Sequence, residues 1–186
     1  MIEEPRNPWK TLSSELVHDT PWISVTKHDV INPGGNPSIY STVHFKNLAI
    51  GVIPLDEDNN TWIVGQYRYP LQKYSWEIPE GGGDRNLPPV DSAKRELMEE
   101  CGIKAQSWTP LMQMHTSNSA TDEVVYLFVA RDLSFHEPEP EENEEIEVRK
   151  MPFDELFRMV MDGEITDSLT AAGVMKLKLL MDRGEM

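Results

Sequence analysis

Three glutamates near the middle of the chain have a spacing that could bind a cation. Glu96 and Glu99 are three residues apart, and Glu96 and Glu100 are four apart, so a helix would project all three carboxylates from one face. Like charges at this spacing destabilise a helix by roughly a few tenths of a kcal/mol per pair, unless solvent, basic side chains or a cation relieves the repulsion. The residues alone therefore leave two readings: a solvated acidic face, or a binding face for a hard cation such as Mg²⁺.

A helix that would carry these glutamates is predicted from about Pro89 to Cys101. Pro88 and Pro89 stand at its start, and Gly102 lies where a C-cap glycine belongs. Cys101 is the single cysteine of the chain and can form no internal disulfide. Within a helical pattern it is interpreted as a packing residue, with a nucleophilic role as the alternative.

Strands surround this helix in the sequence. Three are predicted in the first 45 residues, with a turn at 32–36, and they indicate a small antiparallel subdomain. Two more, at 48–55 and 61–69, are predicted to form a hairpin across a polar turn. The rest of the pattern comprises a short strand entering the glycines at 81–83, strands at 108–115, 123–133 and 146–151, and helices near 153–161 and 168–181. This order predicts an α/β fold, a mixed sheet packed between helices.

Composition limits the possible partners. The 186 residues can bury one main core with a small appended subdomain. A formal net charge of -15 without a cluster of Lys and Arg argues against nucleic acid as a partner. We expect no membrane span, because no apolar run is long enough. Without a signal-like N-terminus, and with one cysteine, the expected location is the cytoplasm.

Residues 81–103 resemble the Nudix box, Gly-x5-Glu-x7-Arg-Glu-U-x-Glu-Glu-x-Gly-U, in which U is a bulky aliphatic residue. Eight of its nine specified positions are present in register, from Gly81 through Arg95 to the final pair Gly102-Ile103. Leu87 stands where the family usually has a glutamate that braces the arginine. The support of Arg95 is therefore in question, and Asp84 or Asp91 are candidate substitutes.

The resemblance implies a fold and two domains. The fold is the Nudix α/β/α sandwich with an N-terminal antiparallel β subdomain. Residues 1–45 would form that subdomain and contribute to dimerisation, and residues 46–186 would form the Nudix hydrolase domain.

The resemblance also implies a metal site and a reaction. Glu96 and Glu100 would be the main ligands of Mg²⁺, with Mn²⁺ as a possible replacement, and Glu99 would bind further or bridge to a second ion. The backbone carbonyl of Glu80 would add a contact, and Arg95 would orient the carboxylates. Glu99 and Glu100 thereby take part in catalysis of pyrophosphate hydrolysis by a metal-activated water.

The approach to the box resembles a particular group within the family. The string QYRYPLQKYSWEIPEGG, residues 66–82, is similar to that of ADP-ribose and nucleoside diphosphate sugar pyrophosphatases. Arg68 would reach a substrate phosphate, for which a guanidinium offers a bidentate fork, and Glu77 would lie in the substrate pocket. The alternatives are a surface arginine and a surface salt bridge.

Within the acidic segment 137–147, the string ENEEIEV, which starts at Glu142, resembles the late catalytic loop of the same group. Glu142 would be the general base and Glu144 a metal contact, with Glu145 as a further candidate. The alternative is an acidic linker in which Pro138 and Pro140 act as spacers.

Residues 116–123 resemble the broader sugar-nucleotide group, but Asn118 replaces a proline frequent in ADP-ribose pyrophosphatases. We therefore expect a range of substrates: ADP-ribose and ADP-, GDP- and UDP-sugars. In this group the N-terminal strands exchange between two subunits, which implies a homodimer. Trp9, Trp22, Tyr40 or Tyr67 could then stack on the base, although each alone is more typical of core or interface.

Two other functions stay open. One is a Nudix hydrolase of nucleoside triphosphates or dinucleoside polyphosphates, against which the N-terminal strands argue. The other is a Nudix sensor that binds nucleotide sugars without turnover. Sensors usually lose carboxylates of the box, whereas Glu96, Glu99 and Glu100 are all present.

Overall fold

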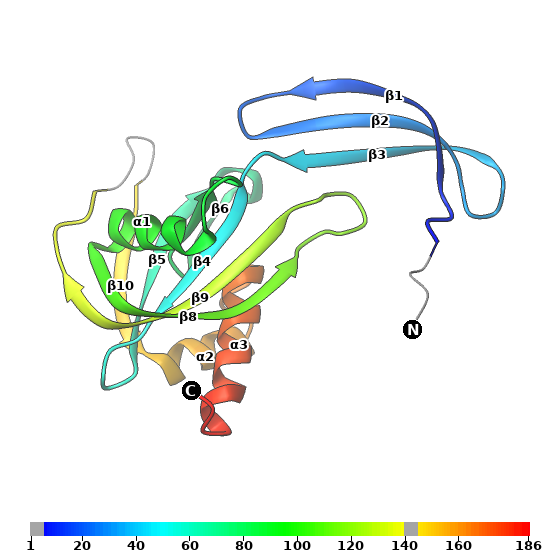
Figure 1. Ribbon diagram of the computed structural model, residues 1–186. Helices are drawn as coiled ribbons and strands as arrows, with labels where there is room; N and C mark the ends of the chain where they lie inside the picture. Colours follow the sequence, from blue (N-terminus) through cyan, green and yellow to red (C-terminus); the bar gives the residue numbers. More distant parts are fainter. Residues whose placement is uncertain (1–5, 140–144) are drawn as a thin grey trace. The chain divides into compact units, whose positions relative to one another are not determined.

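The computed structural model describes residues 6–139 and 145–186, which fold into two compact units (Figure 1). The N-terminal unit comprises the chain up to Asn47 together with His115–Glu123. The larger unit comprises Leu48–Met114 and Val124–Met186. Residues 115–123 thus belong with the N-terminal strands, although a long stretch of sequence separates them.

The N-terminal unit is a three-stranded antiparallel sheet in the order β1-β2-β3, formed by Lys10–Asp19, Ile23–Ile31 and Pro37–Phe45. Thr121 forms a parallel bridge with Val43 of β3, and the main chain of Val43 bonds both Ala120 and Asp122. These bonds attach the loop 115–123 to β3. The small antiparallel subdomain expected from the sequence is confirmed.

The larger unit contains two sheets. One is mixed, in the order β7-β4-β9-β8, with β4 antiparallel to β7 and parallel to β9. The other is antiparallel, in the order β10-β5-β6. The strand bounds are β4 Leu48–Pro54, β5 Asn60–Arg68, β6 Lys73–Glu77, β7 Glu80–Gly83, β8 Ile103–His115, β9 Val124–Phe135 and β10 Glu147–Pro152.

The predicted hairpin of β4 and β5 is wrong. A turn does connect them, with Asn59 at a positive φ of 57°, but the two strands enter different sheets. β4 runs between β7 and β9, and β5 runs between β6 and β10. Both strands are almost continuously buried, and an apolar run does not specify which strands it pairs with.

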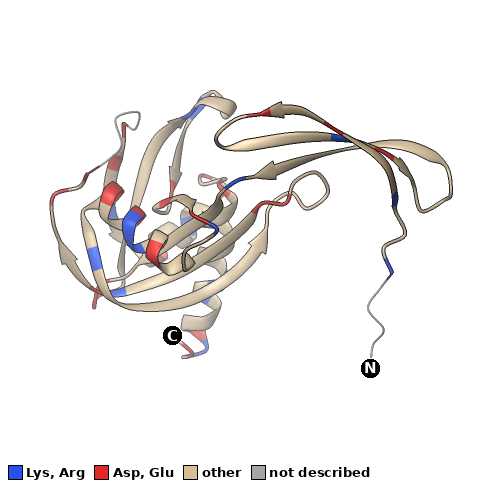
Figure 2. Cartoon of the chain, turned by 45° about the horizontal axis from the view of Figure 1, so that its top comes forward, with Lys and Arg blue, Asp and Glu red and all other residues tan. Residues whose placement is uncertain are grey.

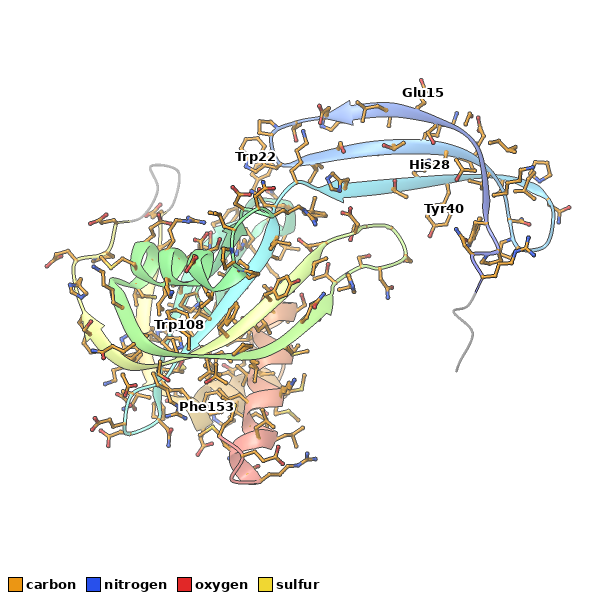
Figure 3. The ribbon with its side chains drawn as sticks, in the orientation of Figure 1. Glu15, Trp22, His28, Tyr40, Trp108 and Phe153 are labelled. Carbon is orange, nitrogen blue, oxygen red and sulfur yellow. The ribbon has the colours of Figure 1, made fainter. Side chains whose placement is uncertain are left out.

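The core lies on both faces of the mixed sheet. Along β4, Ile50 and Val52 pack with α1 (Pro89–Cys101), whereas Ile53 packs with α2 (Phe153–Met161) and α3 (Ser168–Asp182). Successive residues of a strand point to opposite faces, which explains this division. Figure 3 shows the same arrangement, with Trp108 on the α1 side and Phe153 on the side of α2 and α3. The predicted α/β/α sandwich is confirmed.

The ends of the helices follow local chemistry. α1 begins at Pro89 and ends before Gly102, which adopts a left-handed φ of 64° and donates its N–H to the carbonyls of Leu97 and Met98. This confirms the helix predicted from the sequence. At α3, the side chain of Asp167 caps the helix by accepting from the N–H of Thr170 at 2.7 Å. Over the described ranges, no helix has the length and apolar character needed to cross a membrane.

Candidate active site

The acidic face of α1 is largely buried. Glu96 and Glu100 are 7% and 2% exposed, and the side chain of Glu99 is 27% exposed. A solvated acidic face is therefore wrong for two of the three glutamates. Figure 2 shows the acidic positions of α1 in red. Burying carboxylates carries a desolvation cost that partners or a cation must offset.

The strand β7 packs directly against these carboxylates. The main-chain N–H of Glu80 donates to Oε2 of Glu100 at 2.9 Å. A Cβ atom on Gly81 would overlap the carboxylate of Glu96, so a larger residue here would force this side chain or the strand to shift. The box glycine and two box glutamates thus form one packed unit.

Arg95 ties the carboxylates of α1 to the β7 backbone. Its Nη1 donates to Glu99 at 2.6 Å, and its Nη2 donates to Glu96 at 2.5 Å and to the carbonyl of Gly82 at 2.6 Å. Burial alone would lower the pKa of Arg95, but the charges of Glu96 and Glu99 raise it. The guanidinium stays charged and fixes the orientation of both carboxylates.

In the described part of the chain, neither suggested substitute for the missing box glutamate makes a hydrogen bond or an ion pair with Arg95. Asp84 accepts hydrogen bonds from Asn86, and Asp91 pairs with Lys94 at 3.1 Å. Leu87 itself is 53% exposed. The guanidinium of Arg95 is held instead by hydrogen bonds to the carboxylates of Glu96 and Glu99 and to the carbonyl of Gly82 in β7.

A second charged group adjoins the box through Glu80. Nε of Arg68 donates to both oxygens of Glu77 at 3.0 Å, and Nη2 donates to Glu77 and, at 2.9 Å, to Oε1 of Glu80. Glu77 is 2% exposed, whereas the side chain of Arg68 is 34% exposed. Burial would lower the pKa of Arg68, but Glu77, with Glu80 and Asp167, raises it. The structure thus brings the two predicted substrate-binding residues together as an ion pair.

Asp167 completes this group and was missed from the sequence. One carboxylate oxygen each of Glu77, Glu80 and Asp167 lies within 4.8 Å of the others. Burial, with the charges of Asp167 and Glu77, raises the pKa of Glu80 well above its usual range. Oε2 of Glu80 is buried and makes no hydrogen bond within the described ranges. An Asp before a helix reads as an N-cap, so no sequence signal connected Asp167 with Glu77.

Thr170 was also missed, and it holds the segment between β6 and β7. This fully buried side chain accepts the main-chain N–H of Ile78 through Oγ1 at 2.9 Å. Ile78 lies between Glu77 and Glu80 in the sequence. The first turn of α3 therefore positions the residues that link Arg68 to the box.

The acidic segment starts at the C-terminal end of α1. The N–H of His136 donates to the carbonyl of Gly102 at 2.7 Å, and that of Glu139 donates to the carbonyl of Glu99 at 3.0 Å. Glu142 and Glu144, the predicted base and metal contact, lie outside the described residues. In the sequence, residues 140–144 directly follow Glu139, whose backbone is hydrogen-bonded to α1.

The candidate aromatic platform is divided between the two units. Trp9, Trp22 and Tyr40 lie in the N-terminal unit, and Tyr67 lies on β5 of the larger unit. Trp9 and Tyr40 make an edge-to-face contact with ring centroids 5.1 Å apart, whereas Trp22 is 69% exposed; Figure 3 labels Trp22 and Tyr40. Tyr67 is 57% exposed and faces Tyr74 across the β5–β6 pair. Base stacking by these rings stays a prediction.

The environment of Cys101 agrees with a packing role. Burial, followed by the charge of Glu100, raises the pKa of the Cys101 thiol above its ordinary value. A thiol held in its protonated form is a poor nucleophile.

The box residues have the donor set that a hard divalent cation prefers. Glu96, Glu99 and Glu100 present carboxylate oxygens from one helix face, next to the backbone of Glu80. The cluster of Glu77, Glu80 and Asp167 is a second group of oxygen donors close together. The buried, unbonded Oε2 of Glu80 belongs to the residue that joins the two groups. The residues present thus fit a divalent metal ion.

Comparison with known proteins identifies the family. Residues 45–170 match the Nudix domain, and residues 9–43 match the nucleoside diphosphate sugar hydrolase N-terminal domain. The chain belongs to the Nudix hydrolase family and has the N-terminal domain found in nucleoside diphosphate sugar hydrolases.

Individual relatives agree with this assignment. The chain is 33% identical over 171 residues to the ADP-ribose pyrophosphatase of Mycobacterium tuberculosis (strain ATCC 25618 / H37Rv), covering 90% of this chain and 82% of the relative. It is 31% identical over 172 residues to the ADP-ribose pyrophosphatase of Bacillus subtilis (strain 168), covering 91% and 92%. A crystal structure of an ADP compounds hydrolase shares the fold, with a TM-score of 0.85 at 19% identity over 98% of this chain and 100% of that chain. The protein is thus a pyrophosphatase-type hydrolase by family.

Proposed function

We propose that this protein is a Mg²⁺-dependent hydrolase of nucleoside diphosphate sugars, with ADP-ribose among its substrates. The observation that supports it most strongly is the burial of Glu96 and Glu100 against the backbone of Glu80 and Gly81. Buried carboxylates in contact with a glycine backbone are suited to binding a cation that is shared with a diphosphate. The match to the N-terminal domain of nucleoside diphosphate sugar hydrolases favours this substrate class.

The reaction adds water across the pyrophosphate bond. The water oxygen bonds to one phosphorus, the bond from that phosphorus to the bridging oxygen breaks, and the products are a nucleoside monophosphate and a sugar phosphate. A bound Mg²⁺, or Mn²⁺ in its place, would acidify the water and neutralise developing charge. The residues proposed to hold it are Glu96, Glu99, Glu100, Glu144 and the carbonyl of Glu80, and Arg68 would contact a phosphate.

Glu142 is the proposed general base. Support comes from the described neighbour Glu139, whose N–H bonds the carbonyl of Glu99 at the end of the box helix. We expect Glu142→Gln to lower kcat by about 100-fold with little change in KM, because a base acts in the transition state. Glu145→Gln, a change in the other candidate base, is measured for comparison. An unchanged kcat in Glu142→Gln, with a loss in Glu145→Gln, would move the base to Glu145.

A substrate panel tests the function. Phosphate release is measured from ADP-ribose, GDP-mannose, UDP-glucose, ATP and a diadenosine polyphosphate, with millimolar Mg²⁺ and a coupled phosphatase or pyrophosphatase as each substrate requires. Turnover concentrated on the diphosphate sugars supports the proposal. Turnover on triphosphates alone would keep the metal site but replace the substrate class. Binding of nucleotide sugars without turnover would identify a sensor.

We also propose that the protein is a homodimer formed through the N-terminal strands and that it acts in the cytoplasm. Large apolar side chains of the N-terminal unit are exposed in the single chain, including Leu16 at 60%, Trp22 at 69% and Ile39 at 62%. A second copy of the chain could cover exposed apolar side chains of this size. Light scattering coupled to gel filtration gives the oligomeric state, and a monomer at micromolar concentration would reject the dimer.

A further inference from the structure

The hydrogen bonds of Arg68 leave one of its nitrogens for a ligand. A guanidinium has five N–H groups. The Nε–H is shared by both oxygens of Glu77, and Nη2 donates to Glu77 and Glu80. Within residues 6–139 and 145–186, Nη1 of Arg68 makes no hydrogen bond. Its two N–H groups remain for a substrate oxygen.

Burial separates the roles of Arg68 and Glu77. Glu77 is 2% exposed and directs both oxygens at Arg68, so a ligand arriving from solvent meets the arginine first. Arg68 keeps a 34% exposed side chain. We infer that Glu77 is a positioning residue, which holds Arg68 so that Nη1 alone contacts a phosphate oxygen of the substrate. This inference rests on the proposed function, and it replaces both the bidentate fork and the direct substrate contact of Glu77 expected from the sequence.

The position of Arg68 relative to the box makes this arrangement useful. Arg68 bonds the side chain of Glu80, and the main chain of Glu80 bonds Glu100. One residue, Glu80, therefore links Arg68 to the carboxylates that are proposed to hold a metal ion. Without Glu77, the long arginine side chain would regain rotamer freedom, which substrate binding would then have to offset.

A double-mutant cycle tests the inference on two readouts. Arg68→Ala, Glu77→Gln and the double variant are compared with the unchanged protein for turnover of ADP-ribose and for the Kd of ADP in Mg²⁺, measured by calorimetry. We expect each single variant to raise KM and Kd by about tenfold, and the double variant to stay within about threefold of Arg68→Ala. A fall in kcat at unchanged KM would indicate a merely structural loss of active protein. Glu57→Gln, an exposed change in the β4–β5 turn, is the control.

Additive losses in the double variant would overturn the inference, because Glu77 would then act independently of Arg68. If Glu77→Gln does not fold, Glu77→Asp replaces it. This variant keeps the carboxylate on a side chain shorter by one methylene, and we expect the same non-additivity with Arg68→Ala. The Kd of ADP tests this inference separately from the proposed function. Absence of ADP-ribose turnover in the unchanged protein would reject the function, while the Kd values would still report whether Glu77 acts through Arg68.

Discussion

The main-chain N–H of Glu80 donates to the buried carboxylate of Glu100 across 2.9 Å. This bond joins the last turn of α1 to the strand that precedes it by some twenty residues of sequence. Because Glu80 also contacts Arg68 through its side chain, one residue connects the box helix with the second charged group. The geometry of both groups then depends on the packing of β7 against α1.

Glu100→Gln tests the metal site. One of the two readings of the sequence was a solvated acidic face, but Glu100 is 2% exposed. Gln keeps an oxygen to accept the Glu80 N–H, and it removes a charge from a crowded acidic region, so we expect the melting temperature not to fall. Turnover should fall by about 100-fold or more through loss of a ligand. Steady-state kinetics and thermal unfolding measure both effects, with Glu57→Gln as the control. A rate within about threefold of the unchanged protein would remove Glu100 from the metal site.

Gly81→Ala tests the close approach of β7 to α1. The added methyl would overlap the Glu96 carboxylate, so Glu96 or the strand must shift. We expect a loss of about 1 to 3 kcal/mol in the free energy of unfolding, together with weaker Mg²⁺ activation. Urea unfolding and the Mg²⁺ dependence of turnover provide the measurements. Gly34→Ala, where the nearest atom is a side-chain oxygen 3.3 Å away, is the matched control and should change neither. Normal Mg²⁺ activation in Gly81→Ala would contradict the packing described.

Thr170→Val tests the link from α3 to the segment between β6 and β7. The change keeps the shape but removes the acceptor of the Ile78 N–H, leaving a buried donor unsatisfied at a cost of about 1 to 3 kcal/mol. Thr170→Ser keeps the hydroxyl and should retain more of the stability. Chemical unfolding compares the two, and turnover is expected to fall in Thr170→Val more than in Thr170→Ser. Equal stability of the two variants would show that the hydrogen bond contributes nothing measurable.

Acid stability depends in part on Asp56. Burial would raise its pKa, but the bonds from Lys150 and Asn60 lower it from 3.8 to about 2. A lowered pKa stabilises the fold above the ordinary value near 3.8, and this stabilisation is lost as pH falls through the folded value. The difference in urea midpoint between the unchanged protein and Asp56→Asn should be largest at pH 5 to 7 and shrink below about pH 4. A difference that stays constant from pH 7 to pH 3 would reject the assignment. Asp58→Asn in the same turn is the control.

The local sequence determined the elements and the acidic helix face. Proline at the start and Gly102 at the end bounded α1, and the 3.6-residue repeat placed Glu96, Glu99 and Glu100 together. These features depend on residues within a few positions of one another. The spacing from Gly81 to Ile103 also sufficed to recognise the family.

Only the tertiary structure decided what those residues contact. The burial of Glu96 and Glu100, the pairing of β4 with β9 rather than β5, and the meeting of Glu77 with Asp167 across ninety positions of sequence all depend on packing between distant segments. An apolar strand or an exposed-looking carboxylate has the same local pattern whichever partner it finds, because hydrophobic burial is not directional. The bonds that use up the fork of Arg68 and leave Nη1 for a ligand therefore become visible only when β5, β6, β7 and α3 are assembled.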